Sequence, residues 1–474
     1  MSLQGRCLRS VKVKCYPGPT SDSPGTDAFK IISECCGSSS RLKHLSIYNA
    51  CLRLNELTDD ARRILMNLES LSLEIVPLVR AIPAIHISCL SPIATGTWTR
   101  AQSTWQLGNW NCKGEEEEGQ TVNNIRRLSI IGNPGTVQEI EDQYGLIVDC
   151  QQLRSLTWTK RSSGDYMGIR IVSDLQAGLW PFLERLDFGQ MNFGQMNFSD
   201  KRLSEIIIAM GQRPLKELKV QRTPFGPLSA RALLWRDADD QGDHYNGRRD
   251  DSQSQGHRVH LESLSVGGCE DVTGAMIQQF LCAFPNLIRF EGTSLTDEDV
   301  LLYPRPWVCT GLKSLRLMIQ IRKQEQTSDD TGEVPASLLT TAKKISISTP
   351  KLKTPPRFFL DRIASLTRLE TLLVGYFGNI VGAQRDHLVD LLLQDDIGME
   401  TLKTLRRLRE VHWGNHLKNM TVEEAEWMIK SWPALEVVIC YIHRVPMQNE
   451  IESLFKSHGI KWTRTIPEED DYGG

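Results

Sequence analysis

Residues 261–269 have the sequence LESLSVGGC, and they contain the pattern on which the whole architecture depends. The pattern is apolar, two variable residues, apolar, one variable residue, apolar, and it falls on Leu261, Leu264 and Val266. Because the last two apolar residues are two positions apart, they point to the same face of a β-strand. A single strand cannot bury that face, so further copies of the pattern are expected beside it.

The same pattern recurs along most of the chain in both directions. Clear copies begin at Leu8, Leu42, Leu68, Ile125, Leu153, Leu183, Leu215, Leu312, Leu369, Leu408 and Leu435, and weaker copies begin at Leu287 and Ala342. Most successive copies lie 25 to 32 residues apart. The gap between Leu68 and Ile125 is about two such periods, which predicts a degenerate repeat near residue 95.

Several segments between the copies have the features of amphipathic helices, namely a capping residue followed by an apolar stripe. Ser199 precedes Leu203, Ile206, Ile207 and Met210; Thr273 precedes Met276, Ile277, Phe280 and Leu281; Thr421 and Glu424 form a capping box before Ala425, Met428, Ile429 and Trp432. Each strand is therefore expected to return through a helix that covers one face of the sheet.

These observations predict an α/β leucine-rich-repeat solenoid, a horseshoe with a concave parallel β-sheet and helices on the convex side. We expect residues 1–474 to form a single solenoid of about 14 irregular repeats. Insertions are expected at 94–124, 236–258, 321–336 and 375–405, with an acidic tail at 466–474.

The stretch from Leu261 to Cys269 resembles the cysteine-containing, ribonuclease-inhibitor-like repeat, and Asp271-Val272-Thr273 resembles the turn of that subtype into its helix. Asn133 occupies the position of Cys269 in its own repeat. The resemblance implies that a buried Cys or Asn at this position hydrogen-bonds the turning backbone.

The irregular repeats, the long insertions and the segment from Trp307 to Leu315 resemble the fungal family of F-box and leucine-rich-repeat proteins. The F-box itself is missing from the pattern, because the first strand copy already begins at Leu8. The resemblance implies the substrate-recognition repeat array of an F-box-type SCF ubiquitin ligase adaptor, with Skp1 as a partner only if an F-box lies upstream. A free-standing leucine-rich-repeat scaffold or inhibitor without a ubiquitin-ligase link is the alternative.

Composition argues against several other classes of protein. The formal charge of −3 gives no reason to expect a nucleic-acid partner. The most apolar stretch, residues 75–94, contains Arg80, His86 and three prolines, so no membrane span is expected. Twelve cysteines occur without a CxxC pair, which argues against a zinc ribbon. The N-terminus has no apolar leader, and we therefore expect reduced thiols and a cytoplasmic or nuclear location.

The chain has no motif that indicates catalysis. GxxxxGK[ST], HExxH and GxSxG are all absent. His412 and His416 are four residues apart, but Val411 belongs to a strand pattern and Gly414-Asn415 separates the two, so packing or surface roles are favoured over a metal site. We expect no enzyme activity, no catalytic residue, no metal and no cofactor.

A protein substrate is expected on the concave face, because the variable strand positions point there. Positions five and seven of the copies supply the candidate partner-binding residues Tyr48, Lys219, Arg316, Met318, His412 and Tyr441. Tyr48, Arg316 and Tyr441 are the expected anchors, since aromatic residues and arginine carry much of the energy of protein interfaces.

Overall fold

The computed structural model describes residues 10–14, 42–50, 64–65, 67–75, 124–132, 137–159, 165–189, 199–211, 213–234, 260–320, 355–374, 399–413, 420–440 and 448–464. The chain forms two compact units, unit 1 over Met1–Asp271 and unit 2 over Val272–Gly474. The prediction of a single array over residues 1–474 stays a prediction.

The described strands of unit 1 pair in parallel, and their order in the sheet is their order in the chain. They are β1 (Ser10–Lys14), β2 (His44–Ala50), β3 (Ser70–Ile75), β4 (Arg127–Gly132), β5 (Ser155–Thr159), β6 (Arg185–Asp187), β7 (Glu217–Lys219) and β8 (Ser263–Ser265). The register places one predicted apolar position of each copy in a single column, which runs through Leu71, Leu128, Leu156, Leu186, Leu218 and Leu264.

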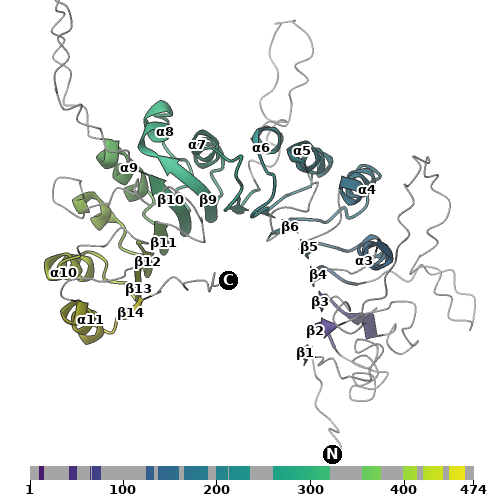
Figure 1. Ribbon diagram of the computed structural model, residues 1–474, viewed down its shortest axis with the longest axis horizontal. Coiled ribbons are helices and arrows are strands. Elements are labelled where there is room, and N and C mark those ends of the chain that lie inside the picture. Colours follow the sequence, from purple (N-terminus) through teal and green to yellow (C-terminus); the bar gives the residue numbers. More distant parts are fainter. Residues whose placement is uncertain are drawn as a thin grey trace, which may run out of the picture. The chain divides into compact units, whose positions relative to one another are not determined.

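The helices of unit 1 lie on one side of these strands (Figure 1). They are α3 (Val137–Asp149), α4 (Asp165–Gln176), α5 (Asp200–Ala209) and α6 (Pro227–Leu234). Leu218 in β7 and Ile206 and Ile207 in α5 are almost completely buried, so the core lies between the sheet and the helices.

Unit 2 repeats this arrangement (Figure 1). Its strands are β9 (Arg289–Thr296), β10 (Ser314–Gln320), β11 (Thr371–Val374), β12 (Glu410–His412), β13 (Val437–Cys440) and β14 (Lys461–Arg464). They also pair in parallel in chain order. Its helices are α7 (Gly274–Ala283), α8 (Asp297–Leu302), α9 (Pro355–Ala364), α10 (Val422–Ser431) and α11 (Gln448–Ser457), with a 3₁₀ helix η8 (Met399–Thr404). The predicted α/β repeat architecture with a parallel sheet is thus confirmed within each unit.

The predicted helix caps are present. Ser199 accepts a hydrogen bond from the amide of Arg202 at the start of α5, and Thr273 accepts one from the amide of Met276 at the start of α7. Thr421 and Glu424 form the reciprocal capping box of α10. These bonds pair amides that the first turn of a helix leaves without partners, and so they stabilise each helix start.

Cys269 has the role that the repeat resemblance implies. Its side chain is 1% exposed, and its Sγ donates to the carbonyl oxygen of Val220 at 2.9 Å. Val220 follows β7, so this bond joins the turn after β8 to the end of the preceding repeat. Asn133, the equivalent position in an earlier copy, lies outside the described residues.

Two predicted strands are wrong. β3 pairs directly with β4, so no strand from a repeat near residue 95 lies between them. β10 pairs directly with β11, so the copy beginning at Ala342 contributes no strand between those two. Paired strands are only about 4.8 Å apart, which leaves no room for another strand in the same ladder. The segments themselves lie outside the described residues. The same holds for the predicted insertions 94–124 (apart from Asn124), 236–258 and 321–336 and for the tail 466–474, since Arg464 is the last described residue.

Two further features differ from expectation. Strand β14 has no leucine at the first position of the pattern, where Gly459 adopts a positive φ of 73°, and the pattern search therefore missed it. The predicted insertion 375–405 extends too far, because η8 and the buried residues Leu402 and Leu405 belong to the packed repeat. Among the described residues, no helix has the length and apolar character that crossing a bilayer requires.

Candidate functional site

The face of each sheet that the described helices do not cover is called the open face here. In unit 1, one column of the open face runs through Lys12, Ser46, Ser72, Ser129, Thr157, Asp187, Lys219 and Ser265. In unit 2, the equivalent column runs through Glu291, Arg316, Leu373, His412, Ile439 and Thr463. Strand alternation therefore places the predicted positions as expected.

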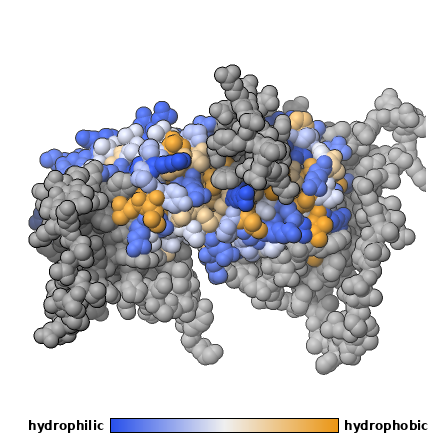
Figure 2. Space-filling view, turned by 90° about the horizontal axis from the view of Figure 1, so that it is seen from above, coloured by the Kyte–Doolittle hydropathy of each residue, from blue (hydrophilic) through white to orange (hydrophobic). Residues whose placement is uncertain are grey.

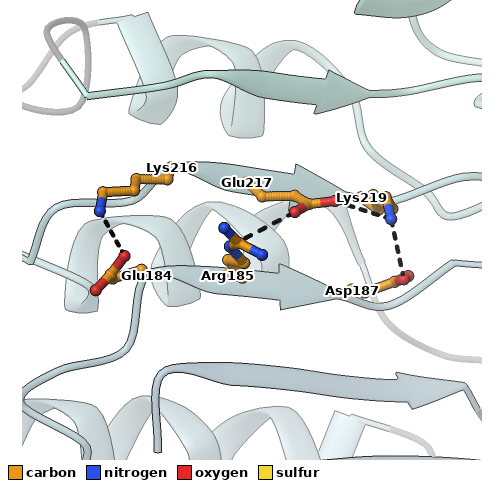
Figure 3. Close-up of polar contacts among 6 residues, drawn as sticks. All are labelled: Glu184, Arg185, Asp187, Lys216, Glu217 and Lys219. Carbon is orange, nitrogen blue, oxygen red and sulfur yellow. Dashed lines mark ion pairs between the residues drawn. The ribbon is translucent and has the colours of Figure 1, made fainter. Parts of the chain in front are cut away.

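Charged side chains of β6 and β7 form ion pairs across the open face of unit 1 (Figure 3). At the start of the two strands, Lys216 Nζ lies 2.7 Å from Glu184 Oε2. Further along, Arg185 Nε lies 3.8 Å from Glu217 Oε2. Lys219 Nζ lies 2.8 Å from Glu217 Oε1 and 3.8 Å from Asp187 Oδ2. Each ion pair thus bridges neighbouring repeats or links two positions of one strand.

Backbone bonds hold the start of these strands in place. The amides of Lys216 and Glu217 both donate to the carbonyl oxygen of Glu184, at 2.7 and 3.1 Å. The amides of Glu184 and Arg185 donate in the same way to the carbonyl oxygen of Arg154. The side chains at these positions are therefore presented side by side at the strand spacing of about 4.8 Å.

Glu184 lies between two cations, Arg154 and Lys216. Burial alone would raise its pKa, but the hydrogen bonds and charges of Lys216 and Arg154 outweigh that effect, and the pKa of Glu184 is lower than that of an ordinary glutamate. Arg154 Nη1 donates to Glu184 Oε1 at 2.9 Å. Glu184 therefore stays charged well into the acidic range.

Strand β8 is different from its neighbours, because both of its open-face residues are buried. Ser263 and Ser265 are each only 5% exposed, although strand alternation places them on the face opposite the core. Their side chains are short and β7 beside them carries Glu217 and Lys219. Small hydroxyl residues here adjoin the long charged side chains of β7.

The open face of unit 2 mixes ion pairs with apolar residues. Arg316 Nη1 lies 2.9 Å from Glu291 Oε1, and His412 Nε2 lies 2.7 Å from Glu410 Oε1. Leu373 and Ile439 flank His412 in its column, and Leu373 is only 5% exposed. Ile439 is partly exposed, so this face offers an apolar side chain beside the His412–Glu410 pair.

The structure describes the side chains of four of the six predicted partner-binding residues. Lys219, Arg316, Met318 and His412 lie on open-face strands and are partly exposed. Lys219, Arg316 and His412 are each held by a carboxylate of the same sheet. The backbone of Tyr48 lies in β2, whereas its side chain and the whole of Tyr441 lie outside the described residues.

The predicted candidates do not include the charged residues at positions two and three of several copies, such as Glu184, Arg185, Lys216 and Glu217. Position three is two residues before position five, so the same alternation rule indicates that it shares the open face. Position two precedes the strand, and its neighbours are set by the backbone bonds between repeats. Only the paired structure reveals those neighbours.

Two further observations concern metal binding and the apolar residues exposed on the helix side. Among the described residues, no group of three or more His, Cys, Asp or Glu side chains is placed to hold a metal ion; His416 lies outside this part of the chain. On the helix side, large exposed apolar residues such as Ile169, Ile208 and Leu302 occur, and Figure 2 shows apolar patches that stand separately among hydrophilic side chains. Such scattered residues do not by themselves indicate an interface.

Comparison with known proteins gives little beyond this geometry. No family model matches the chain. No curated protein matches it. One similar solved structure is a crystal structure of a complex of Rad7 and Elc1 in yeast, with 12% sequence identity and a TM-score of 0.40, and the alignment covers 92% of this chain and 77% of that chain. A similarity at this level carries no functional argument.

Proposed function

We propose that this chain is a protein-binding repeat array that holds a protein partner on the open face of its sheet and has no catalytic role of its own. The observation that carries the proposal is the row of half-exposed polar and charged side chains that successive parallel strands present in fixed register. A sheet whose backbone bonds fix the strands in register loses little backbone freedom when it binds, which favours its use as a recognition surface.

Photo-cross-linking tests this function. A photoreactive amino acid is introduced at Thr157, Lys219 or Arg316 on the open face, and at Ser173 or Glu426 on exposed helix positions as matched controls. We expect covalent adducts with another protein at the open-face positions and few or none at the helix positions. Adducts that form only at the helix positions, or nowhere, would contradict the proposed function.

We further propose, from the repeat resemblance, that the array is the substrate-recognition part of an F-box-type adaptor. This role requires an F-box, so the test compares this chain with a product of the reading frame extended upstream of Met1. Skp1 should copurify with the extended product and not with this chain. If the extended product contains no F-box and recovers no Skp1, a free-standing scaffold or inhibitor becomes the better description.

A further inference from the structure

Along β5 to β7 of unit 1, the basic side chains are more exposed than the carboxylates of Glu184 and Glu217. The side chains of Arg154, Arg185 and Lys219 are 54%, 46% and 40% exposed, whereas those of Glu184 and Glu217 are 14% and 13% exposed. These two carboxylates are therefore largely shielded from solvent, and each is paired with basic side chains. The most exposed charges of β5 to β7 are therefore positive, although the whole chain has a formal charge of −3.

Two arginines at the start of β4 add positive charge beside Glu69, whose carboxylate pairs with Lys43. Arg126 and Arg127 are both exposed, and neither forms an ion pair with any residue in the described part of the chain. The amide of Arg154 donates to the carbonyl oxygen of Arg126, so these two residues are neighbours at the start of adjacent strands. Together with Arg185, they form the basic patch of Arg126, Arg127, Arg154 and Arg185.

The surroundings of the basic patch suit an anion. Arg127 pairs in register with Ser70 on one side and Ser155 on the other. Ser129 and Thr157, half-buried, follow in the next column. These hydroxyl groups can donate hydrogen bonds to carboxylate oxygens and carry no charge of their own. Arginine guanidinium groups add bidentate geometry to the recognition of carboxylates.

We propose that the basic patch binds an acidic segment of a partner protein, in polyproline II conformation, across β4 to β6. This inference rests on the proposed function and names its partner class. Arg127 and Arg185 are separated by two strand spacings, about 10 Å. This equals about three residues of a polyproline II segment, in which side chains three positions apart lie on the same side. Acidic residues three positions apart thus fit the two arginines. A nucleic acid fits less well, because its closely spaced phosphates would also pass over Asp187, Glu184 and Glu217.

Fluorescence anisotropy with the full chain tests this proposal. The probe is a labelled peptide with glutamate at every third position in a glycine and serine background, compared with versions in which glutamine or lysine replaces glutamate. The glutamate peptide should bind, and its affinity should fall as salt is added, because exposed charges are screened. The glutamine and lysine peptides should not bind measurably.

Matched variants then locate the site. The double substitution Arg126→Gln and Arg127→Gln should weaken binding of the glutamate peptide by about tenfold, a modest loss per ion pair. The double substitution Arg406→Gln and Arg407→Gln, at an exposed arginine pair in the turn before β12, should leave it unchanged. Circular dichroism of both variants verifies that each remains folded.

Three results would overturn the inference: no binding of the glutamate peptide, binding that the patch variant does not weaken, or tighter binding of a single-stranded oligonucleotide of equal charge through the same arginines. The cross-links at Thr157 and Lys219 separate this failure from failure of the proposed function. If they form while the acidic peptide does not bind, the array still holds a protein, and only the partner class is wrong.

Discussion

At the residue scale, Cys269 shows how a single side chain joins two repeats. Burial raises its pKa, so the sulfur remains a protonated thiol and can donate to the carbonyl oxygen of Val220. Thr223, whose hydroxyl also donates to Val220 O at 2.7 Å, lies beside it. The turn after one strand is thus bonded to the end of the previous one, away from water.

We expect Cys269→Ala to lower the free energy of unfolding by about 1–2 kcal/mol, because it removes a buried hydrogen bond and a little packing. Urea unfolding measures the loss. Cys269→Ser keeps a donor and should cost less. Equal losses for the two variants would show that packing of the sulfur, rather than its hydrogen bond, is what matters.

Arg213 likewise joins two neighbouring helices through hydrogen bonds. Its guanidinium donates to the carbonyl oxygens of Leu175, Leu179 and Trp180 in and after the last turn of α4, and to those of Ala209 and Met210 at the end of α5. A cation is favourable at helix C-termini, where carbonyl groups lack partners. Trp180, which adopts a positive φ of 52°, is held in that conformation by this bond, its own bond from Nε1 to Ile147 O, and its burial.

Arg213→Lys should reduce stability by about 2 kcal/mol, because an ammonium group cannot reach five carbonyl groups in a plane. Chemical denaturation gives the difference in midpoint. Arg406→Lys, at an exposed turn, is the control and should change the midpoint little. A loss no larger than that of the control would mean that the carbonyl groups find other partners.

At the element scale, the ion pairs between β6 and β7 predict a dependence on pH. The pKa of Glu184 is lowered in the folded chain, so the unfolded chain binds the proton more readily. The contribution of the Glu184 charge to the free energy of unfolding is fully present above the ordinary pKa of glutamate, about 4.3. It is lost as the pH falls through the lowered pKa.

Glu184→Gln should cost about 0.5–1 kcal/mol at neutral pH, a modest value because the basic partners are partly exposed. The difference from the unsubstituted chain should shrink below about pH 4. Unfolding midpoints measured across this range give the comparison. A difference that stays constant down to strongly acidic pH would show that charge is not the source of the effect.

At the scale of the whole molecule, each strand and helix packs mainly on the next one along the chain, as the successive pairings show. Stability in such an array is close to a sum over repeats and their contacts with neighbours. A destabilising substitution in one repeat is therefore expected to lower the stability of adjacent repeats only.

Leu218→Ala, at a position that is 1% exposed, should destabilise its region by about 2–4 kcal/mol. Hydrogen exchange should then accelerate in β6, β7 and β8 and remain unchanged in β2 and β3. Ile131→Ala, on β4 but 41% exposed, is the control. Uniform acceleration through all strands of unit 1 would indicate one cooperative block instead of separable repeats.

Much of the fold was predictable because the repeat signal is local. A two-residue alternation is set by the geometry of a strand, and caps such as Ser199 and Thr421 act within their own helices. Gly292 marks a position where the local sequence pattern is a weaker guide to the strand. It occupies a core position of β9, and a side chain there would lie 2.6 Å from Leu317 Cδ2, so a neighbouring strand supplies the missing volume. The copy at Leu287 is weak for this reason.

The amino-acid pattern alone was sufficient for the strands, their helices and the face on which variable residues lie, because these follow from spacing along one segment. It did not establish which strands pair, since residues far apart in the chain compete for each position in the ladder. It also did not reveal that Glu184 and Glu217 each pair with basic side chains of unit 1. That arrangement depends on repeat-to-repeat register, which backbone bonds between distant segments create.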